Sequence, residues 1–266
     1  MKKKQNKDYW EERGEISYTY KKEVFYTITA VPYYYSRRKI VREKLSKLIK
    51  NKEVVNVCDF GCGDGQYLKY FSFTDLPKKW YGIDISKSMI EQAKKNCPEA
   101  LLEVSSNGIN NEWNNLDLVY SIAVFAHVLN DDVILALFKN IHNKLSDDGY
   151  FIIFEQTGPL RQQGDFWCRR TSNEYSEIAK ECGFTVEESS LITYSIHKLF
   201  ERYIAPVFKR IFVKGKDYSE KSIRANRYYI YRIMSSIMVA LSFRKVRKDD
   251  NSTYGNTFFI FRKVND

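Results

Sequence analysis

Short apolar runs alternate with amphipathic stretches through the central part of the chain. The apolar runs have the length of β-strands and stand at residues 54–60, 79–85, 100–104, 116–122 and 149–156. Helical patterns separate them, most clearly at 131–145, where apolar residues recur at helical spacing. Strands that alternate with helices in this way are typical of a parallel sheet with helices on both faces.

The alternation continues toward the C-terminus with one more helix and two more strands. Residues 173–184 predict a helix that ends at Gly183, 185–194 predict a sixth strand, and 256–264 predict a seventh. Two regions do not follow the pattern. We expect residues 1–50 to form aromatic and basic cap helices, and a helical insert at about 197–250 to interrupt the main domain, residues 51–266.

Composition is consistent with one globular protein. A chain of 266 residues accommodates one α/β domain of about 200 residues with appendages. It has no apolar run long enough to span a bilayer and no apolar segment behind its N-terminal lysines. The five cysteines lack the spacing of a metal site or disulfide framework. We therefore expect a cytoplasmic protein with reduced thiols.

Charge indicates the kind of partner. The net charge of +10 favours an anionic ligand or surface. Within the insert, 224–248 places Ile230, Ile233, Ile237 and Leu241 near one helical face between basic ends. Such a helix suits peripheral contact with the inner face of a membrane, a substrate lid, a dimer surface or ordinary packing. The sequence leaves these alternatives and the oligomeric state open.

The stretch VCDFGCGDG, residues 57–65, places three glycines directly behind the first predicted strand. A glycine-rich turn at this point lets a ligand approach the main chain beside the N-terminus of the next helix. The dinucleotide pattern G-x-G-x-x-G fails because Gln66 occupies its last position. Asp59 would also repel a pyrophosphate there, whereas it suits a cationic amino-acid ligand.

This stretch resembles the first motif of class I S-adenosylmethionine-dependent methyltransferases, D/E-x-G-x-G-x-G, at every fixed position. The resemblance implies a Rossmann-like, doubly wound, seven-stranded α/β sheet, mostly parallel with the last strand antiparallel. It implies S-adenosylmethionine as cofactor and S-adenosylhomocysteine as product. It also implies that Gly61 and Gly63 approach the methionine moiety, that Asp59 supports its ammonium side, and that Asp84 binds the ribose hydroxyls. Further cofactor contacts implied by the resemblance are Ile85, Met89, Ser105, Ser106, Ser121 and Arg38.

The third family motif departs from its usual form, since VSSN stands at residues 104–107. The fourth motif matches at 116–128, and its strand leads toward the expected reaction centre. His127 follows this strand and is a candidate general base for a hydroxyl, or a loop-packing residue. Glu155 ends the fifth strand and is a second candidate catalytic group, or a residue that holds a loop. No metal-ligand spacing is visible, so we expect metal-free transfer.

The polar loop after Glu155 contains the candidate substrate-binding residues Arg161, Trp167 and Arg170. Arginine with an aromatic side chain suits a sugar or a phosphate. We therefore expect methyl transfer to a hydroxyl, or an amine, of a sugar, sugar nucleotide or cell-surface polysaccharide such as capsule. One alternative is an RNA methyltransferase, although an N-P-P-Y type signature is absent after 116–122, so nucleic acid is not the expected partner. The other is a non-catalytic cofactor-binding scaffold.

Overall fold

The computed structural model describes residues 7–12, 30–49, 55–72, 79–194, 206–207, 210, 213–214, 222–223, 244–249 and 254–264. The chain divides into two compact units. One contains Met1–Glu11, Ile49–Ile192 and Val246–Asp266, and the other contains Glu12–Leu48 and Thr193–Lys245. The first unit therefore holds the glycine stretch together with every candidate site residue except Arg38.

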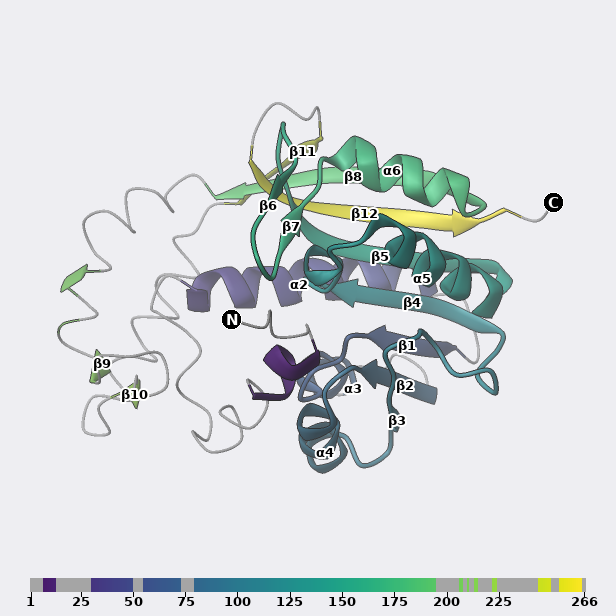
Figure 1. The fold of residues 1–266 in the computed structure, drawn as a ribbon, viewed down its shortest axis with the longest axis horizontal. Helices are drawn as coiled ribbons and strands as arrows, with labels where there is room; N and C mark the ends of the chain where they lie inside the picture. Colours follow the sequence, from purple (N-terminus) through teal and green to yellow (C-terminus); the bar gives the residue numbers. More distant parts are fainter. Residues whose placement is uncertain are drawn as a thin grey trace. The chain divides into compact units, whose positions relative to one another are not determined.

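An eight-stranded sheet forms the framework, in the order β11-β8-β12-β5-β4-β1-β2-β3 (Figure 1). The strands are β1 (Asn56–Phe60), β2 (Lys79–Asp84), β3 (Leu101–Val104), β4 (Leu116–Ile122), β5 (Leu145–Thr157), β8 (Phe184–Tyr194), β11 (Arg244–Lys248) and β12 (Gly255–Lys263). The pairs β1–β2, β1–β4, β2–β3 and β4–β5 are parallel, whereas β12 is antiparallel to β5 and β8. The predicted seven-stranded Rossmann-like sheet with an antiparallel last strand is confirmed, and β11 adds an edge strand.

Helices begin where the sequence offers a side chain to cap them. α4 (Lys87–Asn96) is capped by Ser86, α5 (Asp131–Lys144) by Asn130, and α6 (Ser172–Glu181) by Thr171 in a capping box with Glu174. α3 (Gln66–Ser72) follows the glycine stretch directly, and η1 (Phe125–His127) is a single turn of 3₁₀-helix after β4. The hairpin of β6 (Gln162–Gln163) and β7 (Cys168–Arg169) lies between β5 and α6 in the chain.

Apolar residues of β4 alternate between the two faces of the sheet. Val119 belongs to a buried cluster with Phe138 of α5 and Tyr175 of α6. The next residue, Tyr120, points to the opposite face, where its ring packs edge-on against Phe71 of α3 at 5.5 Å between centroids. Helices thus cover both faces of the sheet and exclude solvent from the strands. A ligand can therefore reach the backbone at the carboxyl ends of the strands.

The second unit contains α2 (Ala30–Ile49) and the antiparallel pair β9 (Val213–Lys214) and β10 (Ser222–Ile223). The expected helical insert is wrong at its C-terminal end, because residues 244–248 extend the sheet as β11. The apolar face from Ile230 to Leu241 lies outside the described residues. No helix within the described ranges is long and apolar enough to cross a membrane.

Candidate active site

The glycine stretch turns tightly at the carboxyl ends of β1 and β2. The N–H groups of Gly61 and Cys62 both donate to the Ile83 carbonyl, at 2.8 and 2.9 Å. Gly61 and Gly63 have φ angles of +79° and +54°, in the left-handed region that favours glycine. A Cβ on Gly61 would lie 2.3 Å from Val124 Cγ2, whereas a Cβ on Gly63 would meet no atom within 4 Å. The backbone beside Gly63 is therefore open to a ligand.

Asp84 ends β2 next to this open backbone. Its Oδ2 accepts from the Gly63 N–H and its Oδ1 from the Ser86 N–H, both at 2.9 Å. Burial raises the pKa of Asp84, while these amide hydrogen bonds oppose the rise. A carboxylate offers about four acceptor positions, so Asp84 keeps the capacity to accept from two hydroxyl groups of a ligand. The geometry fits the ribose-binding role implied by the resemblance.

Asp59 lies deeper, in β1 below the turn, with only 2% of its surface exposed. Burial raises its pKa to about 8, the Tyr120 hydroxyl opposes the rise, and the Asp84 carboxylate adds to it. Its Oδ2 atom has no hydrogen-bond partner among the described residues. An unpaired acceptor under a ligand-binding turn suits a cationic ligand, which would compensate the burial of the carboxylate.

The other predicted cofactor residues fall into different places. Ile85 and Met89 are half-buried at and near the N-terminus of α4, beside Asp84. The Ser105 N–H donates to the Asp84 carbonyl at 2.9 Å, while Ser106 is exposed and bonds to Asn107.

Two predicted cofactor residues are not placed at this edge by the described contacts. Ser121 is fully buried, and its hydroxyl donates to the Phe60 carbonyl at 2.9 Å, which ties β4 to β1. This inward hydrogen bond corrects the expectation that Ser121 faces the cofactor. Arg38 belongs to α2 in the other unit, and its side chain lies outside the described residues.

His127 lies in η1, just beyond the end of β4, and its ring is held on two sides. Its Nδ1 is 2.8 Å from the Phe166 carbonyl oxygen. Because a carbonyl can only accept, Nδ1 carries the proton, and a neutral imidazole then has its lone pair on Nε2. The Trp10 ring packs edge-on against the imidazole, with 4.7 Å between centroids. This is the tautomer that a base would require, and the catalytic role of His127 stays a prediction beside that of a loop-packing residue.

Glu155 is buried against a loop at the edge of the sheet and is not accessible there, which corrects our expectation for it. Its side chain is fully buried, and its Oε1 accepts from the N–H groups of Val124 and Phe125, both at 2.8 Å. Its Oε2 accepts from Ala126 at 3.3 Å. The carboxylate thus binds the amides of the loop that carries His127. We infer that Glu155 positions this loop and transfers no proton.

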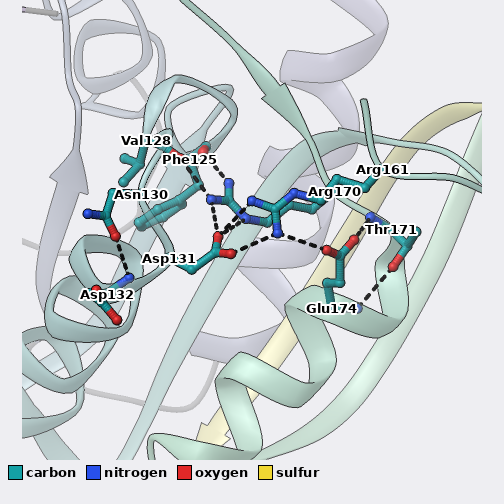
Figure 2. Close-up of polar contacts among 9 residues, drawn as sticks. All are labelled: Phe125, Val128, Asn130, Asp131, Asp132, Arg161, Arg170, Thr171 and Glu174. Atoms are coloured by element: carbon teal, nitrogen blue, oxygen red, sulfur yellow. Dashed lines mark hydrogen bonds and ion pairs between the residues drawn. The ribbon is translucent and has the colours of Figure 1, made fainter. Parts of the chain in front are cut away.

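Arg170 binds the same loop from the carbonyl side, as Figure 2 shows, and this too corrects its predicted role in substrate binding. Its guanidinium is fully buried and donates to the Phe125 and Val128 carbonyls, at 3.2 and 2.9 Å. It also pairs with Asp131 at 2.6 Å. With every side of the guanidinium engaged, Arg170 has a structural role. The loop 124–128 is therefore held between a buried anion and a buried cation.

Arg161 belongs to the same network at the surface. It pairs with Asp131 at 2.8 Å and with Glu174 at 3.1 Å (Figure 2). Hydrogen bonds from Arg161, and from Arg170, lower the pKa of Asp131, although partial burial opposes the shift. The third predicted substrate residue, Trp167, is exposed, with 40% of its surface accessible.

Contacts from the N-terminus were not predicted residue by residue. Residues 7–12 are helical, and the Tyr9 ring stacks on Phe166 with 4.7 Å between centroids. Glu11 Oε1 accepts from the Ser88 N–H at 3.0 Å. Burial alone would raise the pKa of Glu11, but hydrogen bonds from Ser86 and from backbone amides of α4 lower it. One short segment thus contacts the α4 terminus beside Asp84 and the loop beside His127.

Comparison with known proteins agrees with this geometry. The Methyltransferase domain family matches residues 58–153, which include the glycine turn, Asp84 and His127. A putative sarcosine dimethylglycine methyltransferase from Galdieria sulphuraria has a TM-score of 0.59 at 12% identity, over 86% of each chain. An O-methyltransferase from a Brevibacillus brevis polyketide synthase, solved with S-adenosylhomocysteine, has a TM-score of 0.53 at 19% identity, over 92% of this chain and 82% of that one. No curated protein gave a significant sequence match.

The cyclase SpnF has the same fold, with a TM-score of 0.54 at 13% identity over 85% of this chain and 80% of that one. These identities are low, so the structural likenesses show the fold, while the domain match covers the motifs. Together they define a class I methyltransferase. The chain contains a methyltransferase domain at residues 58–153, and the findings support S-adenosylmethionine-dependent methyl transfer with S-adenosylmethionine as the cofactor.

Proposed function

We propose that this methyltransferase transfers the methyl group to a hydroxyl of a sugar, a sugar nucleotide or a cell-surface polysaccharide. The observation that carries the proposal is the hydrogen bond of His127 Nδ1 to the Phe166 carbonyl, at 2.8 Å. It leaves the lone pair of the neutral ring on Nε2, and a hydroxyl acceptor needs such a base. Proton abstraction by a positioned base contributes about 10²–10⁴-fold in rate.

S-adenosylmethionine, when bound, supplies an electrophilic methyl group. Asp84 and the open backbone at Gly63 are the residues that would hold it, with Asp59 below the turn. Glu155 and Arg170 fix the loop 124–128, and the Phe166 carbonyl together with the Trp10 ring fixes the orientation of the His127 ring. Such alignment supplies roughly 7–11 kcal/mol of a displacement barrier. His127 takes the proton of the acceptor hydroxyl onto Nε2 as its oxygen attacks.

The positive charge of the chain supports an anionic acceptor. The net charge is +10, and association with an anionic substrate is favoured by such a field. An amine acceptor would have to lose a proton before attack, and the same base would serve it. We favour the hydroxyl because it requires a base at every turnover.

The test is transfer of labelled methyl from S-adenosylmethionine into separate extract pools: nucleotide sugars, surface polysaccharide, lipids and RNA. Asp84→Ala serves as the blank, since it removes the predicted ribose contact. We expect label in a sugar pool that depends on Asp84. Label in RNA alone would overturn the acceptor class, and label in no pool would favour a cofactor-binding scaffold.

A further inference from the structure

The side chains of Trp167, Arg169 and Tyr254 form a compact platform, in which the two rings are exposed and the arginine is half-buried. Figure 1 shows the hairpin β6–β7 and the start of β12, beside which these residues stand in the chain. The Arg169 guanidinium carbon lies 5.5 Å from the centroid of the Trp167 ring and 5.2 Å from that of Tyr254. The two aromatic residues are 40% and 48% exposed. Exposed rings with a guanidinium against each of them are a preassembled surface for a ligand with both a flat apolar face and a negative charge.

Two glycines give the rings their room. A Cβ on Gly164 would lie 2.6 Å from Trp167 Nε1, and a Cβ on Gly158 would lie 2.3 Å from Tyr254 Cδ1. Both rings therefore lie directly on bare backbone. Gln162 Nε2 also donates to the Tyr254 hydroxyl at 3.2 Å. The platform is thus fixed by its surroundings and needs little ordering when a ligand binds.

The charge of Arg169 distinguishes it from its neighbours. Its hydrogen bonds are to the neutral amide oxygens of Gln162 and Gln156, at 3.0 and 3.4 Å. Arg161 and Arg170 each pair with a carboxylate. Within the described part of the chain Arg169 has no acidic partner, so its positive charge remains available to an anion.

The platform lies on the edge of the sheet that holds the candidate base. Trp167 follows Phe166, whose carbonyl accepts from His127. Tyr254 precedes Gly255, which pairs with Thr157 at the end of β5. The platform is therefore linked to the loop 124–128 through Phe166, the residue that precedes Trp167 in the chain.

We propose that Trp167, Arg169 and Tyr254 form the acceptor-binding subsite and that its ligand is a phosphorylated sugar. The guanidinium binds a phosphate oxygen pair, and the rings pack against the apolar face of the sugar. This inference rests on the proposed function, since it names the substrate class for the same site. Under this proposal the anion-binding residue is Arg169, in place of the Arg161 and Arg170 that the sequence indicated.

The experiment is calorimetric titration of the full chain, saturated with S-adenosylhomocysteine, with three probes: glucose 1-phosphate, UDP-glucose and glucose. The variants are Arg169→Gln and Trp167→Ala, with Arg262→Gln as the matched control, because Arg262 pairs with the exposed Asp148 at 2.7 Å. We expect at least one phosphorylated probe to bind more tightly than glucose. Arg169→Gln should weaken it at least tenfold, Trp167→Ala should weaken it several-fold, and Arg262→Gln should leave it unchanged.

The two phosphorylated probes separate the sources of the phosphate, since preference for UDP-glucose indicates a nucleotide-linked acceptor. Affinity that is equal in Arg169→Gln and the wild type would overturn the subsite. Phosphorylated probes that bind no better than glucose would overturn it as well. Because binding is measured without methyl transfer, a failed subsite is distinguishable from a failed function: label could still enter a sugar pool at full rate in Arg169→Gln.

Discussion

Two loops meet at the carboxyl edge of the sheet, and they are held in opposite ways. The turn at residues 61–65 is shaped by glycines with positive φ, and its backbone beside Gly63 is open. The loop at 124–128 has no glycine, and buried Glu155 and Arg170 bind its amides and carbonyls. The first loop offers its main chain to a ligand, and the second is fixed so that one side chain, His127, is presented.

The two loops differ in which residues determine their conformation. The glycine turn takes its shape from its own residues, because only glycine adopts these φ angles at low cost. The loop 124–128 takes its shape from charges that follow it by about 30 to 45 positions in the chain. Ala123, at its start, has a φ of +59°, which costs energy and persists only where the surroundings determine the backbone.

The largest effect is expected from removing one of the buried charges. Arg170→Met removes the side-chain donor to the Phe125 and Val128 carbonyls and the buried partner of Asp131. Breaking a buried charged network costs about 3–5 kcal/mol in free energy of unfolding. Urea unfolding checks this, with Arg161→Gln as the comparison for a partly exposed arginine on the same Asp131. An equal loss of unfolding free energy in Arg170→Met and Arg161→Gln would show that the buried arginine does not stabilise the loop more than the exposed one.

A glycine pair tests the other loop. Gly61→Ala combines a left-handed φ with a Cβ that collides with Val124, so we expect a loss of roughly 2–4 kcal/mol. Gly63→Ala meets no atom and should cost only about 1 kcal/mol. Although Gly63→Ala should change stability little, it should change binding strongly. Its methyl group fills the ligand's space, so calorimetric titration should show an affinity for S-adenosylhomocysteine that is at least tenfold lower. Unchanged affinity would mean that the ligand does not approach Gly63.

Asp84→Ala separates binding from folding. The variant removes an acceptor for two ligand hydroxyls, and hydrogen bonds to a charged group contribute about 1.5–3 kcal/mol each. We expect S-adenosylhomocysteine affinity to fall on the order of 100-fold, with the circular dichroism spectrum retained. Asp148→Ala, an exposed carboxylate removed in the same way, is the control. Wild-type affinity in Asp84→Ala would exclude the ribose role.

The smallest effect concerns pH and Asp59. Its folded pKa of about 8 lies above the unfolded value of about 4. Its contribution to stability is therefore fully present below pH 4 and is lost as the pH rises to 8. Asp59→Asn removes this loss, so the ligand-free variant should gain about 1–2 kcal/mol over the wild type at pH 9, because relaxation and water entry reduce the full penalty. The gain should vanish at pH 4. Parallel stability curves across this range would contradict the burial of a neutral acid.

Local patterns in the sequence predicted most of the fold. The apolar runs predicted the seven strands, and Gly183 was placed correctly at the end of a helix because helix termination depends on neighbouring residues. The glycine turn was also predicted, because its shape depends on its own residues. β11 was missed because a short basic stretch, Arg244–Lys248, has no apolar alternation to mark it.

The acceptor side could not be predicted as well, since partners far apart in sequence decide what each charge does. Glu155 was predicted to lie in the cleft because it ends a strand, and Arg170 because it stands in the polar loop that follows. One local signal was available: side chains alternate in a strand, so Cys168 and Arg170 point inward while Trp167 and Arg169 point outward. That alternation would have indicated that Arg169, and not Arg170, lies on the outer side of the hairpin.

The most direct test of the central claim is the methyl-transfer rate of His127→Ala into the sugar pool that the wild type labels. S-adenosylhomocysteine affinity is measured on the same preparation. A base held by the Phe166 carbonyl predicts a rate lower by about 10²–10⁴-fold, with affinity within about twofold of the wild type. A rate equal to that of the wild type would contradict the account and leave His127 as a packing residue of the loop.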